Sequence, residues 1–272
     1  PWMQKLPGGL IHVNVVGCAL FAAISGSSAA TVATVGKMSI PELRKRKYPE
    51  KILLGSLAGS GTLGLLIPPS IILIIYGVTV QESIAKLFIA GIIPGIMIAL
   101  IFMFYVIVWS LINKKSMPKS LENYSFIEKI KKSKQLVPVV LLIVAVIGSI
   151  YTGIATATEA ASLGVVGALI ISYLQKSLTK ETFRASLLGA TKTSCMIAFI
   201  LAGATFLSLA MGFTGLPRNL AIWIQGMELS PYVLIFVLMF FYIILGMFLD
   251  GISAVVLTMA IIEPMIRQAG FD

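Results

Sequence analysis

The chain has 272 residues, of which 58% are apolar and 12% charged, and its mean hydropathy is +0.98. A soluble domain has about a quarter charged residues, so this composition excludes a soluble globular protein and predicts a polytopic membrane protein. The net charge of +10 does not indicate nucleic-acid binding, because most basic residues lie in a few connecting loops. We therefore expect a lipid bilayer, and no nucleic acid, around this chain.

The first apolar segment, 9–40, predicts a helical hairpin. Its limbs, 9–24 and 29–40, are separated by a tip of small residues: Ser25, Gly26, Ser27 and Ser28. As a helix the second limb would be about 18 Å long, against about 30 Å for the hydrocarbon core of a bilayer. We therefore expect a re-entrant hairpin, which does not cross the membrane.

The apolar run 52–76 predicts a broken helix. It is interrupted at Gly59-Ser60-Gly61-Thr62 and again at Ile67-Pro68-Pro69-Ser70. A helix broken at membrane depth persists only where it is buried in protein or lines a cavity. Together with the tip at Ser25–Ser28, these interruptions make a pair of interrupted segments, and such pairs indicate the binding site of a secondary transporter. The run 85–112 that follows predicts an unbroken scaffold helix.

The basic residues predict the membrane topology. Five Lys and Arg lie in 41–51, seven in 113–134 and four in 176–192, so we expect these three segments in the cytoplasm. The apolar runs between them then cross in alternate directions and leave 214–230 outside. The stretch 176–191 is compatible with an amphipathic surface helix and equally with an ordinary loop.

The segment 231–266 predicts a second hairpin, with its tip at Asp250–Ser253. Its second limb, 254–266, would be about 20 Å long, and the topology makes this hairpin enter from outside. Asp250 follows Ser27, and Pro264 follows Pro41, by the same 223 residues. The same topology makes the first hairpin enter from the cytoplasm, and hairpins that enter from opposite sides predict an inverted repeat.

The predicted organisation is thus a first repeat, a basic cytoplasmic connection and a second repeat. The first repeat is 1–112, the connection is 113–134, and the second repeat is 135–272 with helices at 135–154, 158–174 and 193–213. We expect an all-α fold that is incomplete at both ends.

The hairpin tips and the broken helix are the candidate binding sites. Free helix amides attract a carboxylate, and free carbonyls and hydroxyls suit a sodium ion. For the cation we select Ser25, Gly26, Ser27, Gly61, Thr62 and Pro68 and, at the second tip, Asp250, Gly251 and Ser253. For the substrate we select Ser27, Ser28, Pro69 and Ser70. The alternative is that the small residues only allow close helix packing.

Other polar residues have simpler explanations. Asp250 can cap the helix that follows it, and such a cap is compatible with a cation ligand. Glu159 is either a helix cap or a transport residue. A protease dyad of His12 and Ser27 is disfavoured, because helical rise separates them by roughly 20 Å. We expect no enzyme activity, no transition metal and no cofactor other than sodium as the coupling ion.

Several motifs resemble the large membrane subunit of TRAP transporters (tripartite ATP-independent periplasmic transporters). They are Leu6-Pro7-Gly8-Gly9-Leu10-Ile11-His12-Val13-Asn14, Ile24-Ser25-Gly26-Ser27-Ser28-Ala29, Gly61-Thr62-Leu63-Gly64-Leu65-Leu66-Ile67-Pro68-Pro69-Ser70 and Gly246-Met247-Phe248-Leu249-Asp250. The resemblance implies a sodium-driven elevator like those of the ion transporter superfamily. It also implies a small membrane subunit and a periplasmic binding protein that delivers an organic acid. The family's second broken helix would lie beyond Asp272.

The resulting hypothesis is the large permease subunit of a sodium-coupled organic-acid importer in the bacterial inner membrane. C4-dicarboxylates and sialic acid are the substrate types that the resemblance implies. One alternative is an ion-coupled carboxylate carrier of the same architecture that needs no binding protein. The other is a membrane scaffold without transport activity, which would not need two broken-helix tips.

Overall fold

The computed structural model describes most of the chain, and every regular element in the described residues is a helix. This confirms the predicted all-α class. The described residues are 2–118, 125–215, 219, 222–223, 226–227 and 230–271. The chain divides into two compact units. Unit 1 is Pro1–Ile74 with Ser83–Gln175, and unit 2 is Ile75–Glu82 with Lys176–Asp272.

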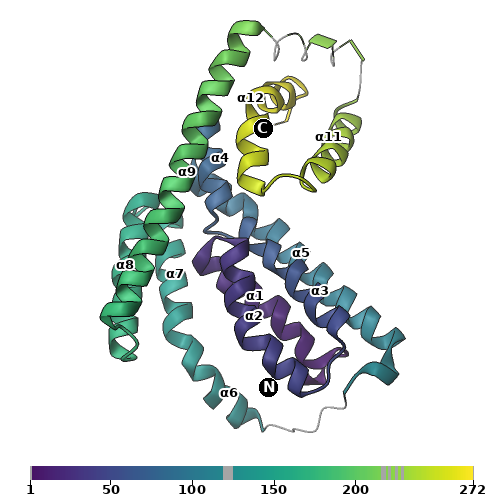
Figure 1. Cartoon of the computed structure of the whole chain (residues 1–272), viewed down its shortest axis with the longest axis vertical. Helices are drawn as coiled ribbons and strands as arrows, with labels where there is room; N and C mark the ends of the chain where they lie inside the picture. Colours follow the sequence, from purple (N-terminus) through teal and green to yellow (C-terminus); the bar gives the residue numbers. More distant parts are fainter. Residues whose placement is uncertain are drawn as a thin grey trace. The chain divides into compact units, whose positions relative to one another are not determined.

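Unit 1 is organised around three helices that lie side by side (Figure 1). They are α1 (His12–Ser25), α2 (Ser28–Lys45) and α3 (Glu50–Gly61), preceded by the short helices η1 (Met3–Lys5) and η2 (Gly9–Ile11). Helix α5 (Ile84–Ile112) packs along α1 and α3. Apolar side chains from η2, α2, α3 and α5 form one buried cluster: Ile11, Leu43, Ile52, Leu53 and Val106.

The helical structure is interrupted after α3, in the segment that contains the double proline. Helix α3 ends at Gly61, η3 (Thr62–Leu65) adds one tight turn, and α4 (Ile71–Val80) begins after Ser70. Proline has no N–H to donate, so Pro68 and Pro69 cannot continue the helical ladder. The broken segment also approaches α5 closely. A Cβ on Gly91 would lie 2.9 Å from the Leu66 carbonyl oxygen, so only glycine fits there.

The rest of unit 1 is a hairpin of α7 (Val137–Tyr151) and α8 (Ala157–Leu174). Thr156 and Glu159 form a capping box at the start of α8, which confirms the capping role for Glu159. The basic connection contains the short helices η4 (Lys114–Ser116), α6 (Phe126–Ser133) and η5 (Lys134–Leu136). Residues 119–124 of that connection lie outside the described residues.

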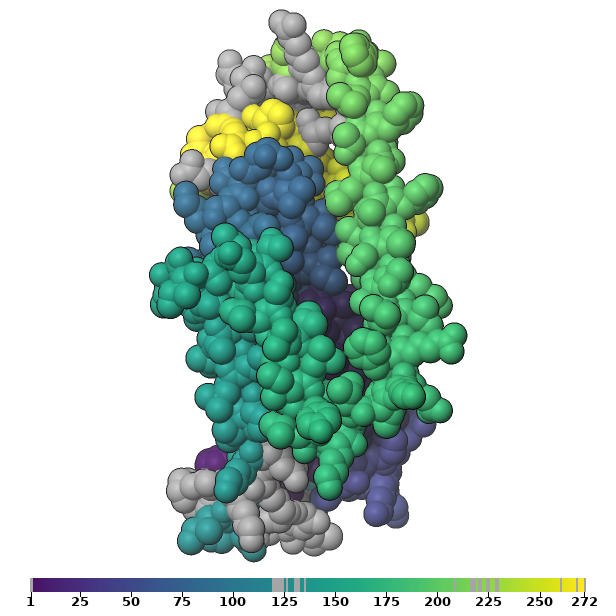
Figure 2. Space-filling model, turned by 90° about the vertical axis from the view of Figure 1, so that its left-hand side faces the viewer, coloured from purple at the N-terminus to yellow at the C-terminus, as the bar shows by residue number. Residues whose placement is uncertain are grey.

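Unit 2 contains α9 (Lys180–Thr214), α11 (Pro231–Leu245) and α12 (Gly251–Gln268). Helix α9 has 35 residues and is continuous through 180–191, so neither a separate surface helix nor a loop precedes the predicted span. The reason is local: Thr179 and Thr182 cap its start, and no proline follows before Thr214. Figure 2 shows α9 in green, with side chains exposed along its length. Most of the connection 216–229 lies outside the described residues.

Three described helices are long and apolar enough to cross a membrane: α5, α8 and α9. The second limbs of the two hairpins are longer than expected. Helices α2 and α12 have 18 residues each and continue past Pro41 and Pro264. One proline removes one helical hydrogen bond, and the good helix formers after it sustain the helix. A helix of this length measures about 27 Å, which is close to the thickness of the hydrocarbon core. Helix length therefore does not distinguish a re-entrant limb from a membrane span, and the re-entrant hairpins stay a prediction.

Candidate functional site

The tip of the first hairpin reverses the chain in two residues. Gly26 adopts the left-handed conformation with φ +58°, and its N–H donates to the Ala22 carbonyl at 2.9 Å. Ser27 is extended and caps α2, where its side chain accepts from the Ala30 N–H at 3.4 Å. Glycine at the end of one helix and serine at the start of the next are the residue types that such ends favour.

Oxygen atoms gather at this tip. The Ser25 Oγ lies 2.9 Å from the Thr31 Oγ1, and both hydroxyls are within hydrogen-bond distance of the Ser27 carbonyl oxygen, at 3.3 and 2.7 Å. Thr31 is fully buried. Thr31 is not among the residues that the sequence predicts for this site. Its position four residues after Ser27, on the same helix face, is the signal that could have found it.

The tip lies directly against the broken helix, backbone to backbone. The Ile71 N–H points to the Gly26 carbonyl at 3.4 Å, and a Cβ on Gly26 would stand 2.9 Å from the Pro69 carbonyl oxygen. A Cβ on Gly64 would stand 3.0 Å from the Ser27 carbonyl carbon. Any side chain at these glycines would push the two backbones apart. The end of one broken helix therefore meets the tip of the hairpin.

The structure places the remaining predicted residues of unit 1 on several sides of this contact. Gly61 faces α2, because a Cβ there would overlap the Val32 side chain. Pro68 is buried beside Gly91 of α5. The Ser70 hydroxyl donates to the Leu65 carbonyl at 2.6 Å and so closes the loop. Thr62 is exposed, and its hydroxyl donates to the Gly59 carbonyl at 2.7 Å.

The second tip, in unit 2, is built around a carboxylate. The Asp250 Oδ2 accepts from the backbone N–H groups of Ile252 and Ser253, at 3.1 and 3.3 Å, and Gly251 is the first residue of α12. This confirms Asp250 as a helix cap. That its charge also helps to bind a cation stays a prediction. The Tyr242 hydroxyl lies 2.6 Å from the Thr258 Oγ1 and joins α11 to α12.

The two tips carry matching landmarks. Ser27 and Asp250 each cap an 18-residue helix, and Pro41 and Pro264 occupy the same position within those helices. Arg44 and Arg267 also correspond, and each forms an ion pair near the end of its helix. All three pairs are 223 residues apart.

The chemistry available at the first tip is uncharged. Hydroxyl and carbonyl oxygens suit a hard cation, and helix N-termini suit an anion. Among the described residues, no group of three or more His, Cys, Asp or Glu side chains is placed to hold a metal ion. His12 is buried at the other end of α1, with its Nε2 2.8 Å from the Pro7 carbonyl oxygen.

These features define a helical membrane protein in which a hairpin tip packs against a broken helix. Residues 4–272 match the family described as "Tripartite ATP-independent periplasmic transporter, DctM component", and the chain belongs to that family. The resemblance to TRAP large membrane subunits is therefore confirmed.

Several relatives cover almost the whole chain. It is 33% identical over 266 residues to the C4-dicarboxylate TRAP transporter large permease protein DctM of Pseudomonas aeruginosa, covering 97% of this chain and 62% of that protein. It is 32% identical over 270 residues to the sialic acid TRAP transporter large permease protein SiaM of Vibrio cholerae, covering 98% and 62%. It is 32% identical over 276 residues to the isethionate TRAP transporter permease protein DctMQ of Oleidesulfovibrio alaskensis, covering 99% and 42%. The chain thus spans less than two thirds of the length of these relatives.

Proposed function

We propose that the chain forms part of the large permease of a sodium-coupled importer that carries an organic acid across the bacterial inner membrane. Membership of the family supports the permease role. Relatives named for C4-dicarboxylates and sialic acid support a carboxylate substrate. The description of the family as tripartite supports two partners, a small membrane subunit and a periplasmic binding protein.

The backbone contact between Gly26 and Pro69 is the observation that carries the proposal. It brings the end of a broken helix to a hairpin tip, where Ser25, Ser27 and Thr31 supply neutral oxygen atoms. In the proposed mechanism a sodium ion takes these oxygens as ligands. The substrate carboxylate then lies at the N-terminal ends of α2 and α4, beside Ser28 and Ser70.

The absence of basic residues at this tip gives a physical reason why binding of sodium and binding of the carboxylate would be coupled. The tip segment 25–31 contains no Lys or Arg to balance a carboxylate. A bound sodium ion would supply that positive charge, so each ligand would raise the affinity for the other. An elevator also needs the hairpin and the broken helix to move as one body. The close backbone packing at Gly26 and Gly64 supports such a rigid body.

The test is sodium-dependent uptake by the full-length protein with its partners in proteoliposomes. We expect Ser25→Ala and Thr31→Val to raise the half-saturating sodium concentration about five- to a hundredfold, because each removes a hydroxyl of this oxygen cluster. Thr62→Ala tests whether the exposed Thr62 hydroxyl is also a ligand of the sodium ion. The matched control is Thr205→Ala, because Thr205 also donates to its own helix, at the Leu201 carbonyl on α9.

The outcomes separate the competing functions. Unchanged sodium dependence in both Ser25→Ala and Thr31→Val, with normal expression, would contradict the cation site. Full uptake without an added binding protein would favour an ion-coupled carrier that works alone. No uptake of any tested carboxylate by the wild-type assembly under a sodium gradient would favour a scaffold.

A further inference from the structure

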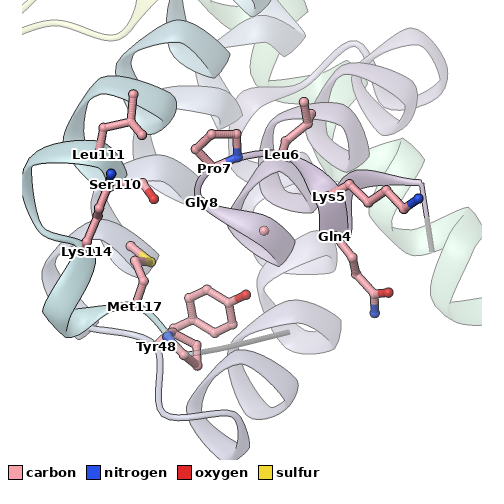
Figure 3. Close-up of a pocket in the computed structure, with 12 residues that line it drawn as sticks. Gln4, Lys5, Leu6, Pro7, Gly8, Tyr48, Ser110, Leu111, Lys114 and Met117 are labelled. Atoms are coloured by element: carbon pink, nitrogen blue, oxygen red, sulfur yellow. The ribbon is translucent and has the colours of Figure 1, made fainter. Parts of the chain in front are cut away.

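A cavity of about 330 Å³ lies in unit 1, at the end of the three-helix cluster away from the hairpin tip. Its lining includes Tyr48 from the basic segment 41–51 and Lys114 from the basic segment 113–134. Figure 3 shows Ser110, Leu111 and Lys114 on one side of the cavity and Lys5, Pro7 and Gly8 on the other. The fold therefore brings two basic segments, distant in sequence, to one cavity.

The Pro7-Gly8-Gly9 turn forms one wall of this cavity and has no part in the proposed transport site. Gly8 and Gly9 both have positive φ, and a Cβ on Gly9 would stand 2.6 Å from the Tyr48 hydroxyl oxygen. That oxygen accepts from the Leu10 N–H at 3.1 Å. The Tyr48 hydroxyl is thus held in place by the turn and keeps its own hydrogen to donate to a ligand.

The electrostatics of the cavity favour an anion. Lys5 and Lys114 line it, and none of the lining residues that the structure describes is acidic. The acidic residues of segment 41–51, Glu42 and Glu50, already contact Arg46 and Arg44 at 2.6 and 2.7 Å. Neither lysine forms an ion pair within the part of the chain that the structure describes. Together with the Tyr48 and Ser110 hydroxyls, the lysines suit an anion with several oxygens, such as a phosphate.

One edge of the cavity continues into an apolar surface. Leu111 belongs to the lining and is 47% exposed. Val108 and Phe104 lie on the same face of α5, are exposed, and lead away from the cavity along a helix long enough to span a membrane. A volume of 330 Å³ holds a headgroup, while acyl chains would need the open surface beside it.

We propose that this cavity binds the phosphate headgroup of an anionic phospholipid, with the acyl chains along the Leu111 face of α5. Basic pockets at the cytoplasmic ends of membrane helices take such headgroups. The site is separate from the hairpin tip, so it does not depend on the proposed sodium or carboxylate sites. It assigns a role to the Pro7-Gly8-Gly9 turn, which holds Tyr48 at the cavity.

The test is native mass spectrometry of the full-length protein, purified with any subunit that accompanies it. We expect phosphatidylglycerol to bind more tightly than phosphatidylcholine. Lys5→Ala and Lys114→Ala should each weaken phosphatidylglycerol binding about fivefold, because one lysine near an anionic headgroup contributes about that factor. Lys115→Ala is the matched control, because Lys115 is exposed and adjacent but does not line the cavity.

Three results would overturn the proposal. The first is that phosphatidylglycerol binds equally to the Lys114→Ala and Lys115→Ala variants. The second is that phosphatidylcholine and phosphatidylglycerol bind equally to the wild-type protein. The third is displacement of the lipid by an equal concentration of inorganic phosphate, which would identify a free anion as the ligand. The thermal unfolding temperature of each variant is measured in the same detergent as a control, and we expect it to equal that of the wild-type protein.

Discussion

The tips of the two helical hairpins start their second helices, α2 and α12, with different chemistry. In the first, Gly26 turns the chain within two residues, and neutral hydroxyls gather against a broken helix. In the second, the turn extends over 246–250, none of these residues has positive φ, and a carboxylate caps the helix. The residue that corresponds to Gly26 is Leu249, 223 positions later.

This difference shows which tip is constrained by a neighbour. Gly26 must lack a side chain because the Pro69 carbonyl stands where a Cβ would be. Leu249 carries a full side chain at the corresponding position of the second tip. The matching caps and prolines are what the predicted repeat would produce, and the two tips differ at the turn itself.

The largest contrast concerns the membrane sides of the two hairpins, which we expect to be opposite. In right-side-out vesicles, a cysteine at Lys115 should be protected from an impermeant reagent, whereas one at Gly215 should react fully. The exposed native Cys195 is first replaced by serine, while Cys18 is buried. Permeabilised vesicles are the control, since both positions should then react. The reverse pattern would invert the topology and the direction in which each hairpin enters.

The next largest effect is expected at Gly26. Gly26→Ala should lower the free energy of unfolding by about 2–4 kcal/mol, because alanine is strained at φ +58° and its Cβ meets the Pro69 carbonyl oxygen. Gly153→Ala is the matched control, because Gly153 has φ +73° with no atom near its Cβ position. It should show only the backbone strain, about 1–2 kcal/mol. Equal losses in denaturation measurements would mean that the backbone contact contributes nothing.

The smallest effect on stability is expected at Asp250. Asparagine caps about as well as aspartate, so Asp250→Asn should unfold at the wild-type temperature, whereas Asp250→Ala should lose about 1 kcal/mol. If the charge helps to hold a cation, Asp250→Asn should still depress sodium-driven uptake in proteoliposomes. Wild-type uptake and sodium dependence for Asp250→Asn would leave Asp250 as a cap alone.

Composition and helix signals explain why much of the fold was predictable. The hydropathy of 84–112 and the proline pair at 68–69 act locally, so the scaffold helix and the helix break could both be placed within a few residues. The Thr156 and Glu159 cap is likewise a local signal. The ends of α2 and α12 were harder, because polar residues after a proline can continue a helix or leave it.

The sequence by itself determined the membrane class, the two hairpins, the broken helix and the family, since these depend on hydropathy and short motifs. Only the tertiary structure decided which of the candidate residues meet. It placed Thr31 with Ser25 and Ser27, turned Thr62 outward, and set the carbonyl of Pro69 against Gly26. The physical reason is that a binding site depends on contacts between segments about 40 residues apart, and the direction of each side chain follows from packing that no local pattern records.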